Sequence, residues 1–315
     1  MLRVAVVLLM CISFWQCRPT SPTATPAEKK LIPVSIWPAD SLPRLGNYWK
    51  QGKAEISRFD LQQHRYRDVH PGEAVLVMVT EDFLTDQQVK NDRYENPNSI
   101  PVLKTNLFTR FTTGIYDYSM MTSAFTPVNA AGFPMTLKTT HSSQDWCGQT
   151  FMQVNWAGDA YKVQVRSYFE SEGDVDTTVA PAVLEDELWN RIRMQPEQLP
   201  TGKVRMLPSA TVARLLHIPF SPIETDATLG EYAGNDFAGP ELRAYKVVFP
   251  SLQRTLEIVF EAQAPHLIAG WTDAYPDFDG QIRRTVAKRT HLILDDYWTH
   301  NSLNDKGMRN RLGLE

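Results

Sequence analysis

From residue 50 onward, the dominant feature of the sequence is the alternation of apolar and polar side chains within short segments. In one such segment, the apolar residues Tyr161, Val163 and Val165 alternate with Lys162, Gln164 and Arg166. Successive side chains of a β-strand leave it on opposite faces, so this period of two predicts a strand with one buried and one solvated face. The pattern therefore favours a protein of strands and turns over a helical bundle.

Many other segments show strand patterns, and short turns separate them. We expect strands at 54–66, 74–83, 102–111, 114–125, 135–142, 149–156, 203–207, 242–249, 254–262, 266–272 and 282–294. The expected turns include 70–72, 157–159 and 250–253. Short strands joined by tight turns predict a mainly β fold with minor α, built from antiparallel sheets. These sheets form either one long curved sheet, like half a barrel, or two packed β-rich lobes.

One segment, 183–194, has a helical pattern, because Leu184, Leu188 and Ile192 recur one turn apart. Acidic residues lie at its beginning and two arginines near its end, which suits the helix dipole. A shorter helix is expected at 211–216, with Ser209 near its N-terminus. The longer helix divides the chain into a first β-rich lobe at 32–180 and a second part, helix plus β-rich lobe, at 181–315.

The N-terminal residues resemble a secretion signal. Met1-Leu-Arg3 is basic and precedes an apolar run of about eleven residues, which is too short to span a bilayer. Residues 18–31 follow; they are rich in proline, serine and threonine, and such a composition predicts a flexible tether. A signal, a cysteine and a tether together indicate a bacterial lipoprotein, with residues 1–17 as the signal region and Cys17 as the lipidated residue. The sequence thus predicts membrane attachment through an N-terminal lipid.

The charge balance and the cysteine content limit the classes of partner. With 36 acidic and 32 basic residues the net charge is -4, which does not favour nucleic-acid binding. Once the chain begins at Cys17, Cys147 is the one other cysteine and no internal disulfide is possible. The seven histidines show no metal-ligand spacing within a helix, and the sequence contains no HExxH, CxxC, GxxxxGK[ST] or GxGxxG motif. No metal and no cofactor are predicted.

The best local candidate for chemistry is the segment 141–149, His-Ser-Ser-Gln-Asp-Trp-Cys-Gly-Gln. A cysteine nucleophile needs a base, and His141 lies six residues before Cys147. In an extended strand these two residues would be roughly 20 Å apart at about 3.3 Å per residue, so a turn would have to join them. The alternatives are a ligand-facing polar cluster and a plain structural role for the segment. The candidate ligand-binding residues are Gln144, Asp145, Trp146 and Gln149.

A second candidate is an acidic stretch between Glu170 and Asn190 that contains no basic residue. Carboxylate clusters bind calcium, and paired carboxylates hydrolyse glycosides. The spacing is not that of an EF-hand, and the simpler interpretation is a solvated turn followed by acids at a helix N-terminus. The stretch contains Glu170, Glu172, Asp174, Asp176, Glu185, Asp186 and Glu187.

Four segments, YSMMTS (118–123), SSQDWCGQ (142–149), SYFESEGD (167–174) and LEDELWNRIR (184–193), resemble a family of uncharacterised predicted lipoproteins from Bacteroidetes-type bacteria. Some members carry the label "septum formation inhibitor Maf", which implies nucleotide pyrophosphatase activity. The motif Ser-x-Ser-Pro-Arg-Arg of that enzyme class is absent, and the segment nearest to it, Ser41-Leu-Pro-Arg-Leu45, lacks the second serine and the paired arginines. The resemblance implies a cell-envelope location and no specific activity.

The sequence therefore favours a non-enzymatic, lipid-anchored protein of the cell envelope, at the outer membrane and facing the periplasm. It would bind an apolar or glycan ligand or a partner protein, because curved antiparallel sheets often enclose ligands. One alternative is a hydrolase that acts on envelope material through Cys147 or the carboxylates of 170–187. A second alternative is a nucleotide pyrophosphatase. The sequence does not specify the oligomeric state.

Overall fold

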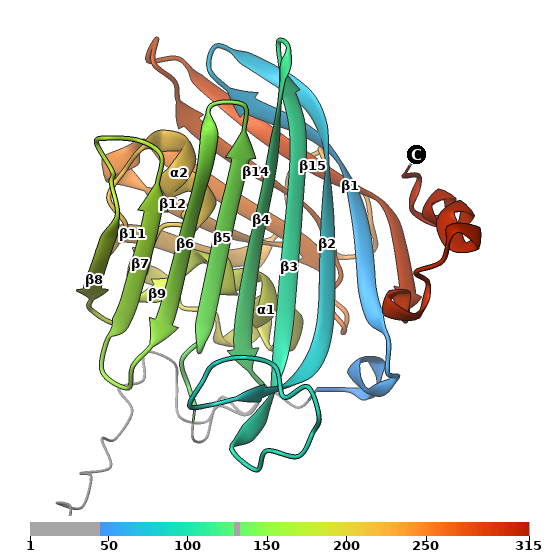
Figure 1. Ribbon diagram of the computed structural model, residues 1–315. Helices are drawn as coiled ribbons and strands as arrows, with labels where there is room; N and C mark the ends of the chain where they lie inside the picture. Colours follow the sequence, from blue (N-terminus) through green and yellow to red (C-terminus); the bar gives the residue numbers. More distant parts are fainter. Residues whose placement is uncertain (1–44, 129–132, 315) are drawn as a thin grey trace, which may run out of the picture. The chain divides into compact units, whose positions relative to one another are not determined.

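Fifteen strands pair in one continuous sheet, in the order β8-β7-β6-β5-β4-β3-β2-β1-β15-β14-β13-β12-β11-β10-β9. The structure is a computed structural model that describes residues 45–128 and 133–314 (Figure 1). All neighbouring strands are antiparallel except β9 and β10, which are parallel. β1 pairs with β15 at the centre, and the edge strands β8 and β9 leave the sheet open.

The two halves of the sheet come from the two halves of the chain. The first half consists of β1 (Ala54–Arg65), β2 (Asp68–Leu84), β3 (Ser99–Thr113), β4 (Tyr116–Pro127), β5 (Lys138–Asp145), β6 (Gly148–Trp156), β7 (Tyr161–Ser167) and β8 (Val175–Val179). The second half consists of β9 (Val183–Leu184), β10 (Gly202–Leu207), β11 (Ile223–Glu231), β12 (Leu242–Phe249), β13 (Arg254–Glu261), β14 (Ile268–Pro276) and β15 (Ile282–Asp295). The predicted boundary at 180/181 lies between β8 and β9, the two edge strands.

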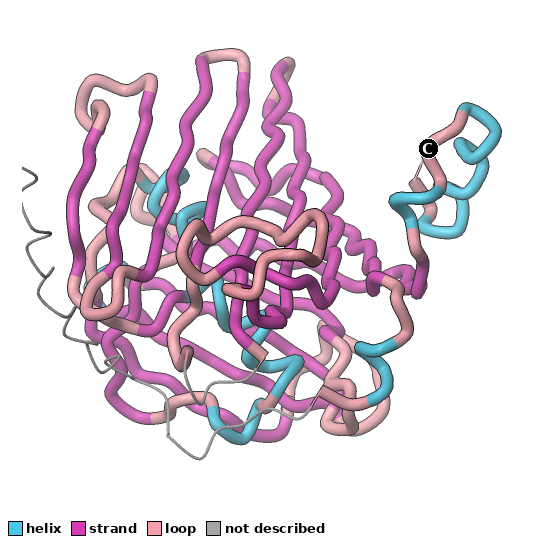
Figure 2. The backbone as a smooth tube through the Cα atoms, turned by 60° about the horizontal axis from the view of Figure 1, so that its bottom comes forward, coloured by secondary structure: helices cyan, strands magenta, loops and turns pink. Residues whose placement is uncertain are grey.

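Two short α-helices occupy the concave side of the curved sheet, between its halves (Figures 1 and 2). The helix α1 (Leu188–Met194) contacts β3 and β4, while its Trp189 ring meets the ring of Trp271 in β14 edge-on, with centroids 5.0 Å apart. The helix α2 (Ala210–Leu216) contacts β4 and β5. The remaining helical turns are η1 (Asn47–Lys50), η2 (Glu185–Glu187), η3 (Pro196–Gln198), η4 (Pro250–Leu252), η5 (Tyr297–Thr299) and η6 (Leu303–Leu312). None of the helices in the described part of the chain is long and apolar enough to cross a membrane.

The main hydrophobic core lies on the concave side, and a second cluster covers part of the convex side. In β2, Leu76 and Met78 belong to the main core, whereas Val77 and Val79 point to the other face and belong to a second cluster that includes Leu312 of η6. The continuous apolar run at 75–79 is therefore covered on both faces, as the sequence predicts for a central strand.

The predicted fold class is confirmed: the protein is mainly β, and one large curved sheet is the arrangement that forms. The turn expected at 70–72 is wrong, because the β1–β2 hairpin turns at Tyr66, which has a φ of 57°. Gly72 lies within β2, where an added Cβ would stand 2.2 Å from the backbone oxygen of Arg110 in β3. This glycine therefore permits a close approach between two strands.

The helix expected at 183–194 begins later than predicted. Val183 and Leu184 form the edge strand β9, Glu185–Glu187 is a 3-10 turn, and the α-helix starts at Leu188. The shorter helix is confirmed as α2, and the Ser209 hydroxyl caps it by accepting a hydrogen bond from the backbone nitrogen of Val212 at 3.0 Å.

Candidate functional site

A pocket of about 340 Å³ lies between α2 and the concave face of β5–β8; we call it the side pocket. Its volume falls within the range of small-molecule sites, roughly 300 to 1,000 Å³. Apolar side chains dominate its walls: Phe151, Met152, Val163, Val165, Val175, Ala210, Ala213, Ile218, Pro219 and Phe220. The polar lining residues are His141, Thr150, Ser171, Glu172, Thr177, Arg214 and His217.

β5 brings His141 to the side pocket, since Thr139, His141 and Ser143 all point to the buried face of that strand. Its Nδ1 lies 2.9 Å from the hydroxyl oxygen of Thr122 in β4. Burial and the nearby charge of Arg214 lower the pKa of His141 to about 3, so the imidazole is neutral at physiological pH. Its Nε2 has no hydrogen-bond partner in the described part of the chain.

Arg214 comes from the last turn of α2 and is buried, with its side chain 5% exposed. Its Nη2 donates to Oδ2 of Asp145 at 3.0 Å, and its guanidinium carbon stands 4.5 Å from the centre of the Phe169 ring. At the rim of the side pocket, His217 and Glu172 form a second pair, with Nδ1 and Oε1 2.5 Å apart. The side pocket thus combines apolar walls with one buried cation.

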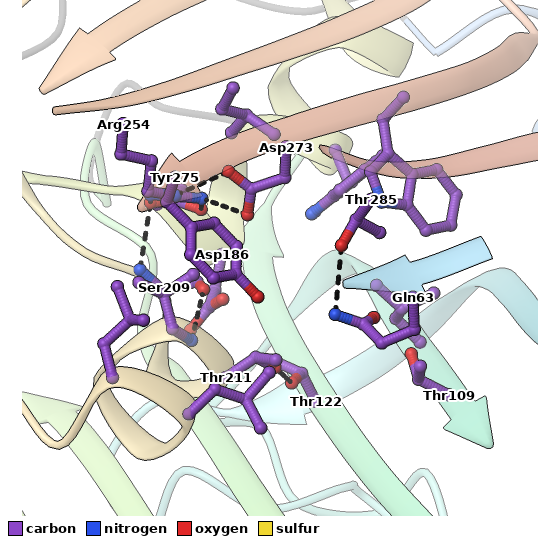
Figure 3. Close-up of a pocket in the computed structure, with 18 of the residues that line it drawn as sticks. Gln63, Thr109, Thr122, Asp186, Ser209, Thr211, Arg254, Asp273, Tyr275 and Thr285 are labelled. Carbon is purple, nitrogen blue, oxygen red and sulfur yellow. Dashed lines mark hydrogen bonds and ion pairs between the residues drawn. The ribbon is translucent and has the colours of Figure 1, made fainter. Parts of the chain in front are cut away.

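A smaller cavity of about 80 Å³ lies on the other side of α2, between α1, β1, β3, β4 and β13–β15; we call it the central cavity (Figure 3). Arg254 dominates its polar lining and donates to Glu185 at 2.6 and 2.7 Å and to Asp273 at 2.7 and 2.9 Å. These buried carboxylates raise the pKa of Arg254 against the opposing effect of burial. At roughly 10–15 Å³ for each water molecule, the cavity has room for a few waters only.

Asp186 lines the same central cavity, and its hydrogen-bond partner among the described residues is a backbone group and not a cation. Its Oδ2 accepts a hydrogen bond from the backbone nitrogen of Ala210 at 3.1 Å. Burial raises the pKa of Asp186 to about 7, and the neighbouring carboxylate of Glu185 adds to the increase. This carboxyl group therefore changes its protonation state near neutral pH.

A wider hollow of about 820 Å³ lies at the ends of β6–β8, beside residues 85–88. Its lining is mostly polar and includes Gln88, Asn155 and Lys162. None of its described lining residues has a buried polar side-chain atom without a partner, in contrast to the side pocket. The side pocket is the better candidate for a specific ligand site.

The structure does not bring the predicted pair His141 and Cys147 together. Cys147 is exposed at the tip of the β5–β6 hairpin, whereas His141 is buried further down β5 and hydrogen-bonds to Thr122. Asp145 closes the turn by accepting from the backbone nitrogen of Cys147 at 2.7 Å. Among the ligand-binding candidates, only Asp145 reaches into the interior; the other three are exposed on the hairpin: Gln144, Trp146 and Gln149.

The acidic stretch 170–187 separates into two unlike groups. Glu170, Asp174 and Asp176 are exposed, as a solvated turn would be. By contrast, Glu185, Asp186 and Glu187 lie just before the helix α1, as expected for acids at a helix N-terminus, but they are buried. Partners inside the fold satisfy them: Arg254 donates to Glu185, and the backbone nitrogen of Ala210 donates to Asp186. Glu187 accepts from Thr136, which is 51 residues away, and from Arg191, which is four residues away in α1.

Cys17 lies outside the described residues. In residues 45–128 and 133–314 one group of side chains could hold a metal ion: Asp295, Asp296 and His300. Asp295 already accepts a hydrogen bond from Arg311 at 2.6 Å, so the group is explained by its own ion pairs.

Sequence reasoning missed Arg214 and Thr150, two buried polar residues of the side pocket that lie outside the motifs it examined. Thr150 follows the examined segment 141–149 by one position. The available signal was the alternation along β6, which places Thr150 on the same buried face as Met152 and Val154. For Arg214 the signal was its position within the predicted helix, on a turn rich in apolar residues. The partners of both residues could not be read from the sequence.

No protein-family model matches the chain, and no curated protein matches it. Among solved structures, the chain is similar to a beta-barrel-like protein of the domain of unknown function DUF1849 from Brucella abortus. The TM-score is 0.47 and the sequence identity 8%, with 78% of this chain and 98% of that chain covered. This likeness carries no argument about function.

Proposed function

We propose that this protein is a non-enzymatic binding protein that holds a small apolar ligand in the side pocket. The observation that carries the proposal is a pocket of about 340 Å³ with mainly aliphatic and aromatic walls inside a curved sheet. Apolar cavities bind apolar ligands because the ligand leaves water without displacing strongly bound water from the cavity. A few polar groups at one end would orient the ligand.

The test is the binding of N-phenyl-1-naphthylamine, a neutral apolar dye that fluoresces when it leaves water. We expect saturable binding to the wild-type protein and displacement of the dye by 1-decanol. Ala213→Leu fills the side pocket, since Ala213 is 4% exposed and lines it. This variant should weaken dye binding by roughly tenfold or more, because an overfilled site forces its walls apart.

Ala233→Leu is the matched control, because Ala233 is exposed and lies outside the side pocket. Ile218→Trp narrows the same pocket from its loop wall. It replaces Ala213→Leu as the test variant if thermal unfolding shows that Ala213→Leu does not fold. Absence of saturable dye binding, or equal affinities in all three folded variants, would contradict the proposal.

The same proposal includes attachment to the cell envelope, at the outer membrane and facing the periplasm. It rests on the apolar run after Arg3, on Cys17 and on the proline-rich residues 18–31. An acylated cysteine anchors a protein stably, since each buried methylene contributes about 0.8 kcal/mol. In the native host, Cys17→Ser should abolish partition into detergent, and the wild-type N-terminal peptide should carry acyl mass. Retention of Met1 in a cytosolic fraction would contradict the anchor.

A second candidate is contact with a glycan or a partner protein at the tip of the β5–β6 hairpin. Trp146 is 71% exposed there, and a large apolar side chain so exposed often marks a contact surface. Trp146→Ala should reduce binding to envelope glycans in a pull-down and leave dye binding unchanged. Equal glycan binding by the variant and the wild type would remove this candidate.

The two enzyme alternatives have less support. A hydrolase using Cys147 would need a base beside the thiol, and His141 makes its hydrogen bonds elsewhere. A hydrolase using Glu185 would need a free carboxylate, but that group is bound by Arg254. A nucleotide pyrophosphatase would show parallel strands with helices on both faces, whereas β1–β8 and β10–β15 pair antiparallel.

A further inference from the structure

The buried arginines of the interior differ in how fully their donors are used. Arg254 makes four hydrogen bonds to two carboxylates, and Arg193 binds Glu55 through both terminal nitrogens and donates from Nε to the carbonyl oxygen of Pro265. Arg214 has one carboxylate bond, to Asp145, and its Nε and Nη1 have no hydrogen-bond partner within residues 45–128 and 133–314. A buried guanidinium with unused donors is costly, so its position calls for another acceptor.

Other unpartnered polar atoms lie near Arg214. The described residues contain ten buried side-chain polar atoms without a hydrogen-bond partner. Five of these belong to Arg214, His141, Thr150 and Ser143, and Ser143 lies opposite Thr150 in the β5–β6 register. Arg214, His141 and Thr150 all line the side pocket and are at least nine-tenths buried. One small region therefore gathers unused polar groups at the edge of an apolar pocket.

These groups can all act as donors toward the same acceptor. Arg214 offers two N–H groups and the threonine offers a hydroxyl. His141 is neutral, and when Thr122 donates to its Nδ1 the remaining ring hydrogen lies on Nε2. Because these atoms are closed off from bulk solvent, an acceptor must reach them through the side pocket, with a small rotation of the Arg214 side chain.

We propose that the ligand of the side pocket is a single-chain apolar molecule that ends in a carboxylate, with the carboxylate bound by Arg214, Thr150 and His141. This inference rests on the proposed function and adds the chemical class of the ligand. The chain of the ligand would lie against Met152, Val163 and the other apolar walls. The planar guanidinium fork matches a carboxylate through two parallel hydrogen bonds.

The charges around the side pocket favour a monoanion over a more highly charged phosphate. Arg214 already pairs with Asp145, and Glu172, the carboxylate among the described lining residues, is paired with His217 at the rim. Ser167 also donates to Glu172, at 2.5 Å. Because Arg214 carries one positive charge and already pairs with Asp145, a dianion would leave more uncompensated negative charge in the pocket than a monoanion.

The experiment compares four probes of equal chain length as competitors of the neutral dye at pH 7.5: decanoate, 1-decanol, decyl phosphate and decyltrimethylammonium. In the wild-type protein, decanoate should bind roughly tenfold or more tightly than 1-decanol, as charge-assisted hydrogen bonds require. Decyltrimethylammonium should bind most weakly. Arg214→Met should weaken the binding of decanoate far more than the binding of 1-decanol, and Arg214→Lys should weaken decanoate binding to an intermediate extent. Arg205→Met, at an exposed arginine of β10, is the control and should leave the preference unchanged.

Asp145→Asn provides a second variant in case Arg214→Met does not fold. It keeps an acceptor for the hairpin turn but releases Arg214 from its carboxylate, so the preference for decanoate should increase. The inference that the ligand is a carboxylate would be overturned if the wild-type protein showed no preference for decanoate over 1-decanol. It would also be overturned if Arg214→Met and Asp145→Asn both left that preference unchanged. In either case the proposed apolar site would still stand. Tighter binding of decyl phosphate would also overturn the carboxylate inference. If no probe displaces the dye, the proposed function fails as well.

Discussion

Arg193, near the end of α1, donates from both terminal nitrogens to both carboxylate oxygens of Glu55 in β1, and the two side chains are 0% and 1% exposed. The Nη2–Oε2 distance is 2.6 Å. This ion pair fastens the interior helix to the centre of the sheet, where β1 meets β15. The concave side of the protein is therefore held together by paired charges as well as by apolar packing.

Removing one partner of this pair should destabilise the protein strongly. Arg193→Met leaves the Glu55 carboxylate buried without its cation, and such losses typically cost about 3–5 kcal/mol. The free energy of unfolding is measured by urea titration at pH 7. Arg205→Met removes one partner of an exposed pair, with side chains 57% and 71% exposed, and should change stability by less than about 1 kcal/mol. Equal effects of the two substitutions would contradict a structural role for the buried pair.

The carboxyl group of Asp186 should make stability depend on pH in the direction opposite to that of most acids. Because its folded pKa is raised from 3.8 to about 7, the folded protein holds a proton that the unfolded chain has lost between these values. Stability from this group is therefore complete below about pH 4 and falls as the pH rises to 7. Asp186→Asn should remove this decrease and stabilise the protein at pH 8 by up to about 4 kcal/mol.

The measurement for Asp186 is the free energy of unfolding from pH 4 to 8, compared between the variant and the wild type so that other groups cancel. Asp159→Asn is the control, since Asp159 is exposed in the turn after β6. If the difference in unfolding free energy between Asp186→Asn and the wild type does not change from pH 4 to 8, Asp186 is ionised in the folded protein over that whole range, which would contradict the prediction.

The C-terminal turn η6 should stabilise the convex face of the sheet. Leu312 is 8% exposed and belongs to the same hydrophobic cluster as Val77 and Val79, whereas Leu303 in the same element is 93% exposed. We expect Leu312→Ala to lower the free energy of unfolding by about 2 kcal/mol, the low end for a buried leucine. Leu303→Ala should have almost no effect. If both variants unfold at the same urea concentration, η6 does not cover the sheet in solution.

The strands were predictable because each carries its own evidence in its alternating side chains. The predicted segments 242–249 and 282–294 match β12 (Leu242–Phe249) and β15 (Ile282–Asp295) almost residue for residue. Three strands escaped prediction: β9 (Val183–Leu184) lies within the segment that was expected to be helical, and β8 and β11 have weak patterns of their own. β8 is an exposed edge strand without a buried face, and β11 carries few large apolar side chains on its buried positions.

The site was much less predictable, because its residues acquire their roles from partners far away in the sequence. Glu185 is 69 residues from Arg254, and Asp145 is 69 residues from Arg214. Acids at a helix N-terminus ordinarily stay in water, and nothing in the pattern at 185–187 indicated that these three would be buried. His141 and Cys147 lie close in sequence but apart in the fold, because the hairpin turn falls at Trp146 and Cys147.

The most direct test of the account is to map where an apolar probe binds. A neutral decane derivative carrying a diazirine would be bound, activated by light, and located by mass spectrometry of the digested protein. We predict labelling on β6, β7 and the segment 210–220, with a large loss of labelling in Ala213→Leu. Labelling confined to the convex face of the sheet, or equal labelling of Ala213→Leu and the wild type, would contradict a ligand site between α2 and β5–β8.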